Sequence, residues 1–413
     1  MDLTPDQAAR AAGRDGPAAA LALRLVAETG RLLGARRLLP VASAHVDGCL
    51  YHGDSGVFFA ERLAAEGARV AVPTTLNVGA LDLLHPGRVG GDAGRRAMAR
   101  RMMDAYVAIG CRPTWTCAPY QAGHRPAAGS DVAWGESNAV AFVNSVLGAR
   151  SNRYGDFLDA ACAIAGLAPA CGLHLAENRR ARVLVDAGGL SARLLAEDSL
   201  YPVLGAWLGA EIGESVAAVA GLPGDLSEDR LKALGAAAAS TGAVGLFHVI
   251  GRTPEAPDQA TAFAGLPPER VIALDPSMLR QARDRLSTVP PEGAIDAVAL
   301  GSPHFSAAEF AALSALLAGR RARVPIYACT RRDLVPALDR RALEAQNIVI
   351  VADTCVVVTP ILPPGGGVLM TNSAKFAHYA PGTTGWDTVF GSLADCVESA
   401  VAGRVRRDEA SWS

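Results

Sequence analysis

Hydrophobic residues recur along the chain at two alternating spacings, one typical of amphipathic helices and the other of short buried strands. Helical spacing predicts helices over residues 17–36, 93–110 and 137–150, and a further helix begins within FFAERLAAEG at residue 58. Short apolar runs predict strands at residues 37–46, 68–77, 243–250, 270–274, 296–300, 323–328 and 347–352. Helices that alternate with strands in this way favour an α/β fold with largely parallel sheets.

Polar residues gather where several of the strand-like runs end. The segments are SAHVDG (43–48), PTTLN (73–77), TWTCAPY (114–120), GSPHFS (301–306) and DTC (353–355). Ligands of parallel α/β sheets bind beside the carboxyl ends of the strands, so the five segments together predict one binding pocket. Taken singly, each segment is better explained as a cap of the helix that follows it, and only the combination favours a pocket.

Composition narrows the class of protein. A chain of 413 residues suits two or three domains, and we place the regions at 1–150, 151–325 and 326–413. Half of the residues are hydrophobic, and the net charge of −2 gives no electrostatic reason to expect nucleic acid or an anionic membrane as a partner. The first residues lack the apolar segment of a signal peptide, and the longest apolar stretch, 347–362, is too short to span a bilayer. We therefore expect a cytoplasmic enzyme.

The predicted helix over 137–150 carries amides on an apolar background. Asn138 and Asn144 lie among Ala, Val and Phe, and the segment after the helix contains Asn152 and Arg153. A buried amide without a partner costs about 1–3 kcal/mol, so these side chains bond to nearby backbone or line a polar cavity. Arg153 is suited to clamp a carboxylate with two hydrogen bonds, although most arginines are solvated surface charges.

The eight cysteines are more often core residues or ligands than disulfides in a reducing compartment. Cys162 and Cys171 flank an apolar segment and have the surroundings of small core residues. Cys117 and Cys355 each follow a threonine in a polar segment, and Cys396 lies near a helix start. Three such thiolates are compatible with an iron–sulfur cluster, but buried free cysteines are also common.

Long blocks of the chain resemble the large, catalytic subunit of the aconitase X family, a branch of the aconitase superfamily. They run in consistent order from residue 43 to residue 400 and include SAHVDGCLYHGDSG, VPTTLN, TWTCAPY, WGESNAVAFVNSVLGARSNRYGDF, VADTCVVVTPI, TNSAKFAHYAP and FGSLADCVESA. The resemblance implies an aconitase-like fold of several α/β domains around a central cleft and an iron–sulfur-dependent dehydratase. The cluster ligands implied are Cys117, Cys355 and Cys396, a set compatible with [2Fe–2S], [3Fe–4S] or [4Fe–4S] forms.

The implied reaction removes a carbon-bound proton and expels hydroxide, which an iron with an open position assists as a Lewis acid. The catalytic candidates are His45 and Asp47, an H-x-D pair suited to orient a hydroxyl or shuttle a proton, together with Glu136 and Lys375. Lys375 would contact a substrate carboxylate. The candidate substrate-binding residues belong to the same blocks and are Ser55, Thr74, Thr75, Asn77, Ser137, Asn138, Asn152, Arg153, Asn372 and Ser373.

Two departures from the family pattern concern the site. Ser302 stands in LGSPHFS where relatives are expected to have cysteine, which argues against a cluster ligand at this position. Family members also have a small swivelling domain that supplies a catalytic serine, and the resemblance leaves no room for it between Met1 and residue 400. We therefore expect the catalytic base on a second polypeptide, a small subunit.

The family divides between two substrates, cis-3-hydroxy-L-proline, which gives a pyrroline carboxylate, and mevalonate 5-phosphate. The chain lacks a Gly-rich phosphate loop followed by Lys and Ser or Thr, and its polar segments contain hydroxyls and amides rather than lysines. SNRYGDFLDA, from residue 151, also resembles the hydroxyproline branch. We expect the imino acid as substrate, with phosphomevalonate as the alternative.

Two other classes of protein are compatible with the residues. A metal-dependent hydrolase would gather His45, Asp47, His174 and Asp353 around a divalent ion. A scaffold subunit would keep the fold and bind no cluster. Brown protein containing iron and sulfide after anaerobic purification would distinguish the dehydratase from both.

Overall fold

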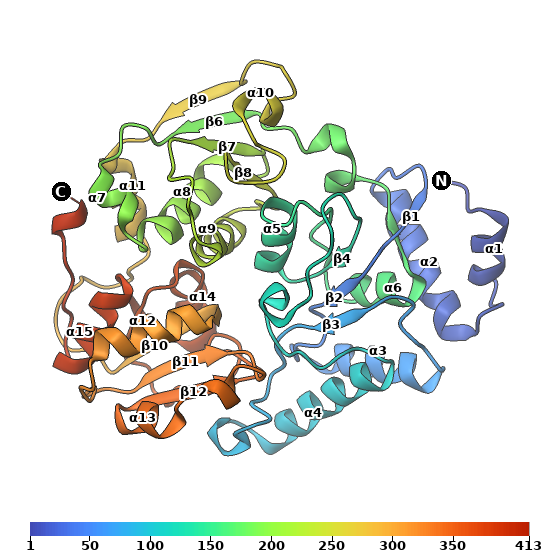
Figure 1. Cartoon of the computed structure of the whole chain (residues 1–413). Coiled ribbons are helices and arrows are strands. Elements are labelled where there is room, and N and C mark those ends of the chain that lie inside the picture. Colours follow the sequence, from blue (N-terminus) through green and yellow to red (C-terminus); the bar gives the residue numbers. More distant parts are fainter. Residues whose placement is uncertain (413) are drawn as a thin grey trace. The chain divides into compact units, whose positions relative to one another are not determined.

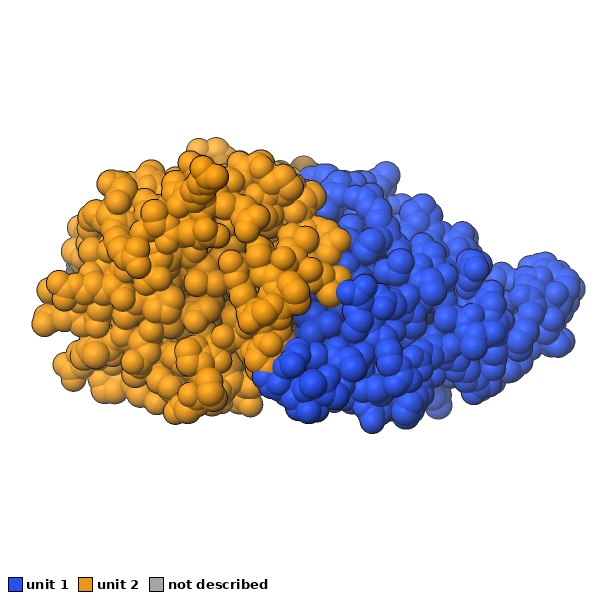
Figure 2. Space-filling model, turned by 90° about the horizontal axis from the view of Figure 1, so that it is seen from below, with its two compact units in different colours: residues 1–81, 91–180 blue, residues 82–90, 181–413 orange. Residues whose placement is uncertain are grey.

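Three small parallel sheets, each covered by its own helices, organise the chain (Figure 1). The computed structural model describes residues 1–412. It divides into two units, which Figure 2 distinguishes by colour: unit 1 comprises residues 1–81 and 91–180, and unit 2 comprises residues 82–90 and 181–413. The α/β class and the largely parallel sheets predicted from the sequence are confirmed.

Unit 1 is built on a parallel sheet in the order β3-β2-β4, with strands β2 (Ala44–Val46), β3 (Thr74–Leu76) and β4 (Ala133–Trp134). A separate antiparallel pair joins β1 (Leu38–Pro40) to β5 (Leu167–Pro169). The helices are α1 (Pro5–Ala11), α2 (Pro17–Leu32), α3 (Asp54–Ala65), α4 (Ala93–Ala108), α5 (Ser137–Ser145) and α6 (Leu158–Ala165). His45 of β2 is paired with Thr75 of β3 and Trp134 of β4, so the three side chains share one face of the sheet.

The first sheet of unit 2 has the order β8-β7-β6-β9, with strands β6 (Val183–Asp186), β7 (Ala217–Ala220), β8 (Phe247–Val249) and β9 (Arg270–Ala273). Its helices are α7 (Ala192–Ala196), α8 (Leu200–Ile212), α9 (Glu228–Thr241), α10 (Gln259–Ala262) and α11 (Pro276–Asp284). Glycines let α8 and α9 approach closely, since a Cβ on Gly205 would lie 2.1 Å from the Leu234 carbonyl oxygen. No larger residue fits there without a shift of the backbone.

The second sheet of unit 2 has the order β12-β11-β10-β13-β14. Its strands are β10 (Ala297–Phe305), β11 (Ile326–Thr330), β12 (Ile348–Ala352), β13 (Val368–Thr371) and β14 (Asp387–Phe390). Its helices are α12 (Ala307–Leu317), α13 (Arg340–Ala345), α14 (Ala374–Thr384) and α15 (Leu393–Ala402). Short 3₁₀ turns connect elements throughout the chain: η1 (Pro86–Arg88), η2 (Pro119–Ala122), η3 (Gly172–His174), η4 (Ala176–Asn178), η5 (Val335–Ala337) and η6 (Ala410–Trp412).

Residues 82–90 belong to unit 2 although both flanking segments belong to unit 1. The buried carboxylate of Asp82 accepts a hydrogen bond from the N–H of Ala352 at 3.2 Å, and Arg88 donates to the carbonyl of Ile350. The N–H of Gly90 donates to the carbonyl of Pro360 at 2.8 Å. The segment is thus held against β12 and the turn after it.

The element boundaries differ from the sequence predictions in places. The helix predicted over 137–150 ends at Ser145, and Gly148 has a left-handed φ of 71°. The units divide at residue 180 rather than 150, because α6 packs against α2 and β5 pairs with β1. Residue 325 lies inside the five-stranded sheet and separates no units.

The helices of the described part of the chain, residues 1–412, include none that is long and apolar enough to cross a membrane. A cytoplasmic location stays a prediction.

Candidate active site

The carboxyl edge of the β3-β2-β4 sheet brings three sequence-predicted segments together. Asp47 follows β2, Asn77 follows β3 and Glu136 lies two residues after β4. Backbone hydrogen bonds between these neighbouring segments continue past the ends of the strands, since the N–H of Asn77 donates to the carbonyl of Val46 at 2.9 Å. The polar tips of this sheet therefore meet at one edge, as the parallel arrangement predicts.

A single amide links two acidic side chains at this edge. Asn77 Nδ2 donates to Glu136 Oε2 at 2.9 Å and also to Asp47 Oδ1. Burial, and after it the charge of Glu136, raises the pKa of Asp47 well above its ordinary value. A carboxyl group in this setting holds a proton more readily than a solvated one and presents it beside a second carboxyl group.

Asp159 holds the segment that carries Asp47, a role that the sequence pattern did not single out. Asp159 Oδ2 accepts the N–H groups of Asp47 at 2.6 Å and of Gly48 at 3.1 Å, and Oδ1 accepts the N–H of Ala160 at 2.6 Å. Burial raises the pKa of Asp159 to about 7, against the effect of these hydrogen bonds. The available signal was an acidic residue within the otherwise apolar helix LDAACAIA.

His45 does not form the predicted side-chain pair with Asp47. Its Nδ1 lies 2.8 Å from Thr75 Oγ1, and the same oxygen lies 2.7 Å from Nδ1 of His124. Burial lowers the pKa of His45 to about 3 and that of His124 to about 4, so both rings are neutral near pH 7. The side-chain partner of His45 is thus Thr75 of β3, and not Asp47 as the H-x-D spacing suggested.

The segment that carries Cys117 runs beside β3. The N–H of Thr116 donates to the carbonyl of Leu76 at 3.3 Å, and Asn138 Nδ2 donates to the carbonyl of Cys117 at 2.6 Å. Trp115 has a φ of 45°, a left-handed conformation that non-glycine residues rarely adopt. A predicted substrate-binding amide therefore fixes the backbone of a predicted ligand cysteine.

In unit 2, Cys355 has surroundings that favour a thiolate. The leading cause is a hydrogen bond from Cys329, and the N–H of Val357 at 3.5 Å, the charge of Lys375 and the hydroxyl of Ser302 act in the same direction, while burial opposes them. Together they lower the pKa of Cys355. Because an iron-bound cysteine is deprotonated, these surroundings fit the predicted ligand.

The turn before Cys355 is held by an ion pair. Asp353 has a φ of 64°, and its carboxylate accepts hydrogen bonds from Arg332 Nε at 2.6 Å and Nη2 at 2.7 Å. A left-handed non-glycine residue costs about 1–2 kcal/mol, which the buried bidentate pair helps to offset. Cys117 and Cys355 are thus both preceded, two residues earlier, by a left-handed residue.

A small pocket of unit 2 contains several predicted substrate-binding residues. Its lining includes Ser302, Asn372, Ser373 and Lys375. Ser373 caps α14 by accepting the N–H of Phe376 at 3.0 Å, and its hydroxyl donates to the carbonyl of Ser302. The structure therefore brings the three candidates from TNSAKFAHY together at the start of one helix.

A buried ion-pair network borders the same pocket. Lys232, whose side chain is 2% exposed, lies 2.8 Å from Asp229 Oδ1, contacts the carboxylate of Glu309 and donates to the carbonyl of His304 at 3.3 Å. Ser306 Oγ donates to Asp229 at 2.7 Å, and its N–H donates to Glu309 at 2.7 Å. The network joins α9 to the start of α12, and it was not predicted from the sequence.

His304 connects this network to the Cys355 turn, since its Nε2 lies 3.1 Å from the carbonyl of Thr354. Burial lowers the pKa of His304 to about 4. Between about pH 6.5 and 4, His304 is therefore protonated in the unfolded chain but neutral in the folded protein. Stability from this group is therefore lost as the pH falls through that range.

In His304→Gln, whose amide can donate the same hydrogen bond without titrating, we expect the free energy of unfolding to fall less steeply, by up to about 1.4 kcal/mol per pH unit. Urea unfolding across the range measures both slopes, and equal slopes would contradict a neutral buried His304.

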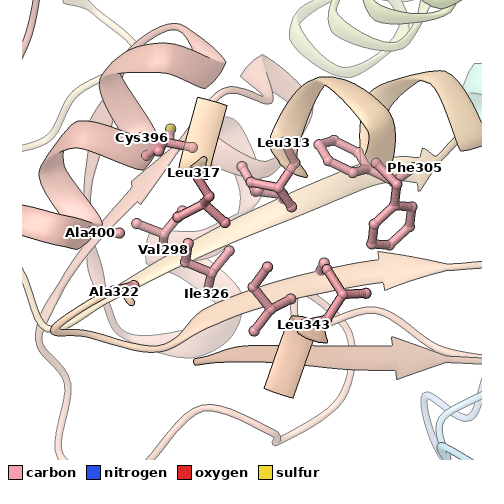
Figure 3. Close-up of a cluster of buried hydrophobic side chains, with 14 of the residues drawn as sticks. Val298, Phe305, Leu313, Leu317, Ala322, Ile326, Leu343, Cys396 and Ala400 are labelled. Atoms are coloured by element: carbon pink, nitrogen blue, oxygen red, sulfur yellow. The ribbon is translucent and has the colours of Figure 1, made fainter. Parts of the chain in front are cut away.

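Cys396 has surroundings unlike those of the other predicted ligands. It is fully buried on α15 within an apolar cluster that includes Val298, Leu313 and Ala400 (Figure 3). Burial raises the pKa of its thiol well above the ordinary value. This environment disfavours a thiolate and does not fit the ligand role predicted for Cys396. Within residues 1–412, no three His, Cys, Asp or Glu side chains gather as a metal site.

The remaining predicted substrate-binding residues serve local structure or face solvent. Thr74 Oγ1 donates to the carbonyl of Val72 at 2.8 Å, and Ser137 Oγ donates to Glu136 Oε1 at 3.1 Å. Asn152 joins the turn at residues 171–173 through two hydrogen bonds, at 2.7 and 3.0 Å. Ser55 and Arg153 are exposed.

The residues proposed for a hydrolase metal site have other partners. His174 lies between the hydroxyl of Tyr154 at 2.6 Å and the carboxylate of Asp131 at 2.7 Å. Asp353 is occupied by Arg332. Each of these side chains is therefore engaged by partners within its own unit.

Comparison with protein families gives three consecutive matches. Residues 1–177 match the description "Aconitase X first domain", residues 181–284 "Aconitase X second domain" and residues 295–402 "Aconitase X third domain". The first match ends close to the division between the two units at residue 180.

Individual relatives agree with these matches. The chain is 44% identical over 410 residues to a cis-3-hydroxy-L-proline dehydratase of Pseudomonas aeruginosa, which covers 97% of this chain and 70% of that protein. It is 38% identical over 384 residues to a phosphomevalonate dehydratase large subunit of Methanothermobacter thermautotrophicus, with 92% and 93% covered. The crystal structure of Thermococcus kodakaraensis aconitase X in its holo-form matches with a TM-score of 0.86 at 32% identity, covering 97% of this chain and all of that one.

Proposed function

The chain belongs to the aconitase X family and is a hydro-lyase, and on this premise we propose that it dehydrates cis-3-hydroxy-L-proline to a pyrroline carboxylate. The observation that most strongly supports this substrate is the 44% identity over 410 residues to the Pseudomonas cis-3-hydroxy-L-proline dehydratase. The identity to the phosphomevalonate dehydratase large subunit is lower, 38% over 384 residues. Mevalonate 5-phosphate is the second candidate substrate, supported by the 93% of that subunit that the match covers.

The pocket of unit 2 supplies groups for a small zwitterion. Lys375 offers a positive charge for the substrate carboxylate, and Asn372 and Ser373 offer an amide and a hydroxyl at the start of α14. The neighbouring Lys232 is already neutralised by Asp229 and Glu309, so it adds no net positive charge for a phosphate. This balance of charge suits a single carboxylate better than a phosphate dianion.

Loss of the hydroxyl requires a proton, and unit 1 contains a group suited to hold one. The raised pKa of Asp47 means that its carboxyl group carries a proton into the pH range where solvated carboxyls are ionised. Asn77 keeps it beside Glu136, and Asp159 fixes the backbone of Asp47 through two N–H groups. We assign Asp47 as the proton donor and Glu136 as the neighbouring carboxyl group that returns a proton to it.

We also propose an iron–sulfur cluster with Cys117 and Cys355 among its ligands. The lowered pKa of Cys355 supports the second assignment, and the hydrogen bond from Asn138 to the carbonyl of Cys117 supports the first by fixing its backbone. When bound, such a cluster supplies a Lewis-acidic iron that stabilises the negative charge of the departing hydroxyl. The environment of Cys396 gives no comparable support.

A small subunit is the proposed partner. Five of the relatives are named phosphomevalonate dehydratase large subunits, and this chain covers 93% of the one from Methanothermobacter. We propose that the small subunit carries a serine that removes the carbon-bound proton. Its docking would also exclude water from the reaction.

The decisive experiment reconstitutes the chain anaerobically with iron and sulfide, together with an aconitase X small subunit from the same source. We expect turnover of cis-3-hydroxy-L-proline and none of the trans-4 isomer, whose hydroxyl is one carbon further from the acidic C–H. The chain alone is expected to be inactive because it lacks the proposed base. Turnover of mevalonate 5-phosphate but not of the imino acid would overturn the substrate assignment, and turnover by the chain alone would overturn the partner assignment.

A further inference from the structure

Two histidine rings share one hydroxyl group inside unit 1. His45 Nδ1 lies 2.8 Å and His124 Nδ1 lies 2.7 Å from the single oxygen of Thr75. Both rings lie against Trp134, with ring centroids 5.6 and 5.0 Å from the indole. The two histidines are 79 positions apart in the sequence (124 − 45). Both lie within hydrogen-bonding distance of Thr75 Oγ1, which β3 carries.

The number of protons fixes how the rings must be arranged. A threonine hydroxyl has one proton, so it can donate to only one of the two Nδ1 atoms. The other Nδ1 must carry its own proton and donate to the hydroxyl oxygen. Because both rings are neutral near pH 7, the first ring then has its proton on Nε2 and the second has a bare Nε2.

The outer ends of this chain are one donor and one acceptor, and both are unused. Within residues 1–412, neither His45 Nε2 nor His124 Nε2 has a hydrogen-bond partner, and both atoms are buried. Buried polar atoms of native proteins nearly always have a hydrogen-bond partner, so each end is a position at which a further hydrogen-bonding group can extend the chain. His45 is completely buried, and the charge of Glu136 acts to raise its pKa. His124 is partly exposed, and the charge of Arg112 acts to lower its pKa.

We propose that His45, Thr75 and His124 form a proton wire that exchanges protons between the buried acidic edge of unit 1 and the partly exposed side at His124. A proton that arrives at His45 Nε2 displaces the Nδ1 proton of that ring onto Thr75 Oγ1. The hydroxyl proton of Thr75 passes to His124 Nδ1, and the Nε2 proton of His124 leaves. One proton enters, one leaves, and the rings exchange their tautomers. This role rests on the proposed dehydratase function, since Asp47 and Glu136 there need a route for proton exchange.

The arrangement can be tested without substrate. In ¹⁵N-histidine-labelled protein near pH 7, we expect one of His45 and His124 protonated at Nδ1 and the other at Nε2, with the signals assigned by single His45→Gln and His124→Gln variants. Averaged signals from rapid exchange of the two tautomers also fit the wire. Thr75→Val, which removes the hydroxyl at nearly constant volume, should abolish the complementary pattern, and Thr75→Ser should keep it. Two rings fixed in the same tautomer, or a pattern unchanged in Thr75→Val, would overturn the proposal.

Kinetics of the reconstituted enzyme test the role in catalysis. Thr75→Val and His124→Gln should lower kcat by about 100-fold with little change in KM, and Thr75→Ser should restore most of the loss. A solvent deuterium isotope effect on kcat should increase in Thr75→Val, because proton exchange becomes limiting. Wild-type kcat in Thr75→Val, on whichever substrate the enzyme dehydrates, would overturn the wire. Failure of cis-3-hydroxy-L-proline as the substrate would overturn only the substrate assignment, because the tautomer measurement does not depend on it.

Discussion

Cys355→Ser is expected to remove bound iron, visible absorbance and dehydratase activity together. The thiolate of Cys355 is stabilised by Cys329, by the N–H of Val357 and by Lys375, and a serine hydroxyl in the same place stays protonated near pH 7. A proton on the ligand atom competes directly with iron. Cys117→Ser should give the same result. Iron and sulfide analysis after anaerobic reconstitution measures the loss independently of activity.

Two further cysteine variants provide the controls. Cys162 lies within α6, where burial raises the pKa of its thiol well above the ordinary value. The Cys162→Ser variant should therefore retain the iron of the protein. Cys396→Ala decides between the sequence prediction and the environment seen in the structure. Retained iron is expected from its position in the apolar cluster, and lost iron would restore Cys396 as a ligand. Full iron in both Cys117→Ser and Cys355→Ser would exclude the proposed ligands.

Lys232→Met is expected to lower the free energy of unfolding by about 3–5 kcal/mol. The ammonium is almost completely buried between Asp229 and Glu309, and its removal leaves two acidic side chains facing each other without a counter-charge. Burial lowers the pKa of Lys232, but the two carboxylates raise it further, so the group is charged in the folded protein. Urea unfolding followed by circular dichroism measures the change.

An exposed ion pair of the same unit serves as the comparison. Arg182 lies 3.0 Å from Glu269, and both side chains are about half exposed, at 48% and 50%. Arg182→Met should change stability by no more than about 1 kcal/mol, because solvent screens such pairs. If Lys232→Met is no more destabilising than Arg182→Met, the buried network does not stabilise the fold in the way described.

The sequence predicted those parts of the site that depend on the order of elements along the chain. Parallel strands place their carboxyl ends at one edge, so the polar segments with Asp47 and Asn77 were found from the pattern, whereas Glu136 was named with the family resemblance; in unit 1 the three side chains meet at one amide. The local sequence around TNSAKFAHY likewise placed Asn372 and Lys375 at a pocket. In both cases a short segment contains the information.

Contacts between distant segments could not be predicted in the same way. Asp159 bonds to Asp47 across 112 positions, and His124 shares a hydroxyl with Thr75 across 49 positions, so no spacing links them. For Cys396, the start of a helix suggested a ligand, but its side chain faces the apolar side of α15. Which face of a helix is buried depends on the sheet beneath it, and the isolated helix pattern did not settle it.

The assignment of residues 82–90 to unit 2 has a consequence for the order in which the chain can fold during synthesis. Arg88 and Asp82 bond to residues 262 and 270 positions later, so the ribosome releases them long before their partners exist. The two parts of unit 1 can therefore be synthesised completely before β12, the partner of this segment, exists. A shortened gene encoding residues 181–413 would produce a chain whose β12 edge lacks this cover, and one encoding residues 1–180 would remove the partners of Asp82 and Arg88 on β12. Attempts to express the two units separately should therefore supply residues 82–90 together with the second piece.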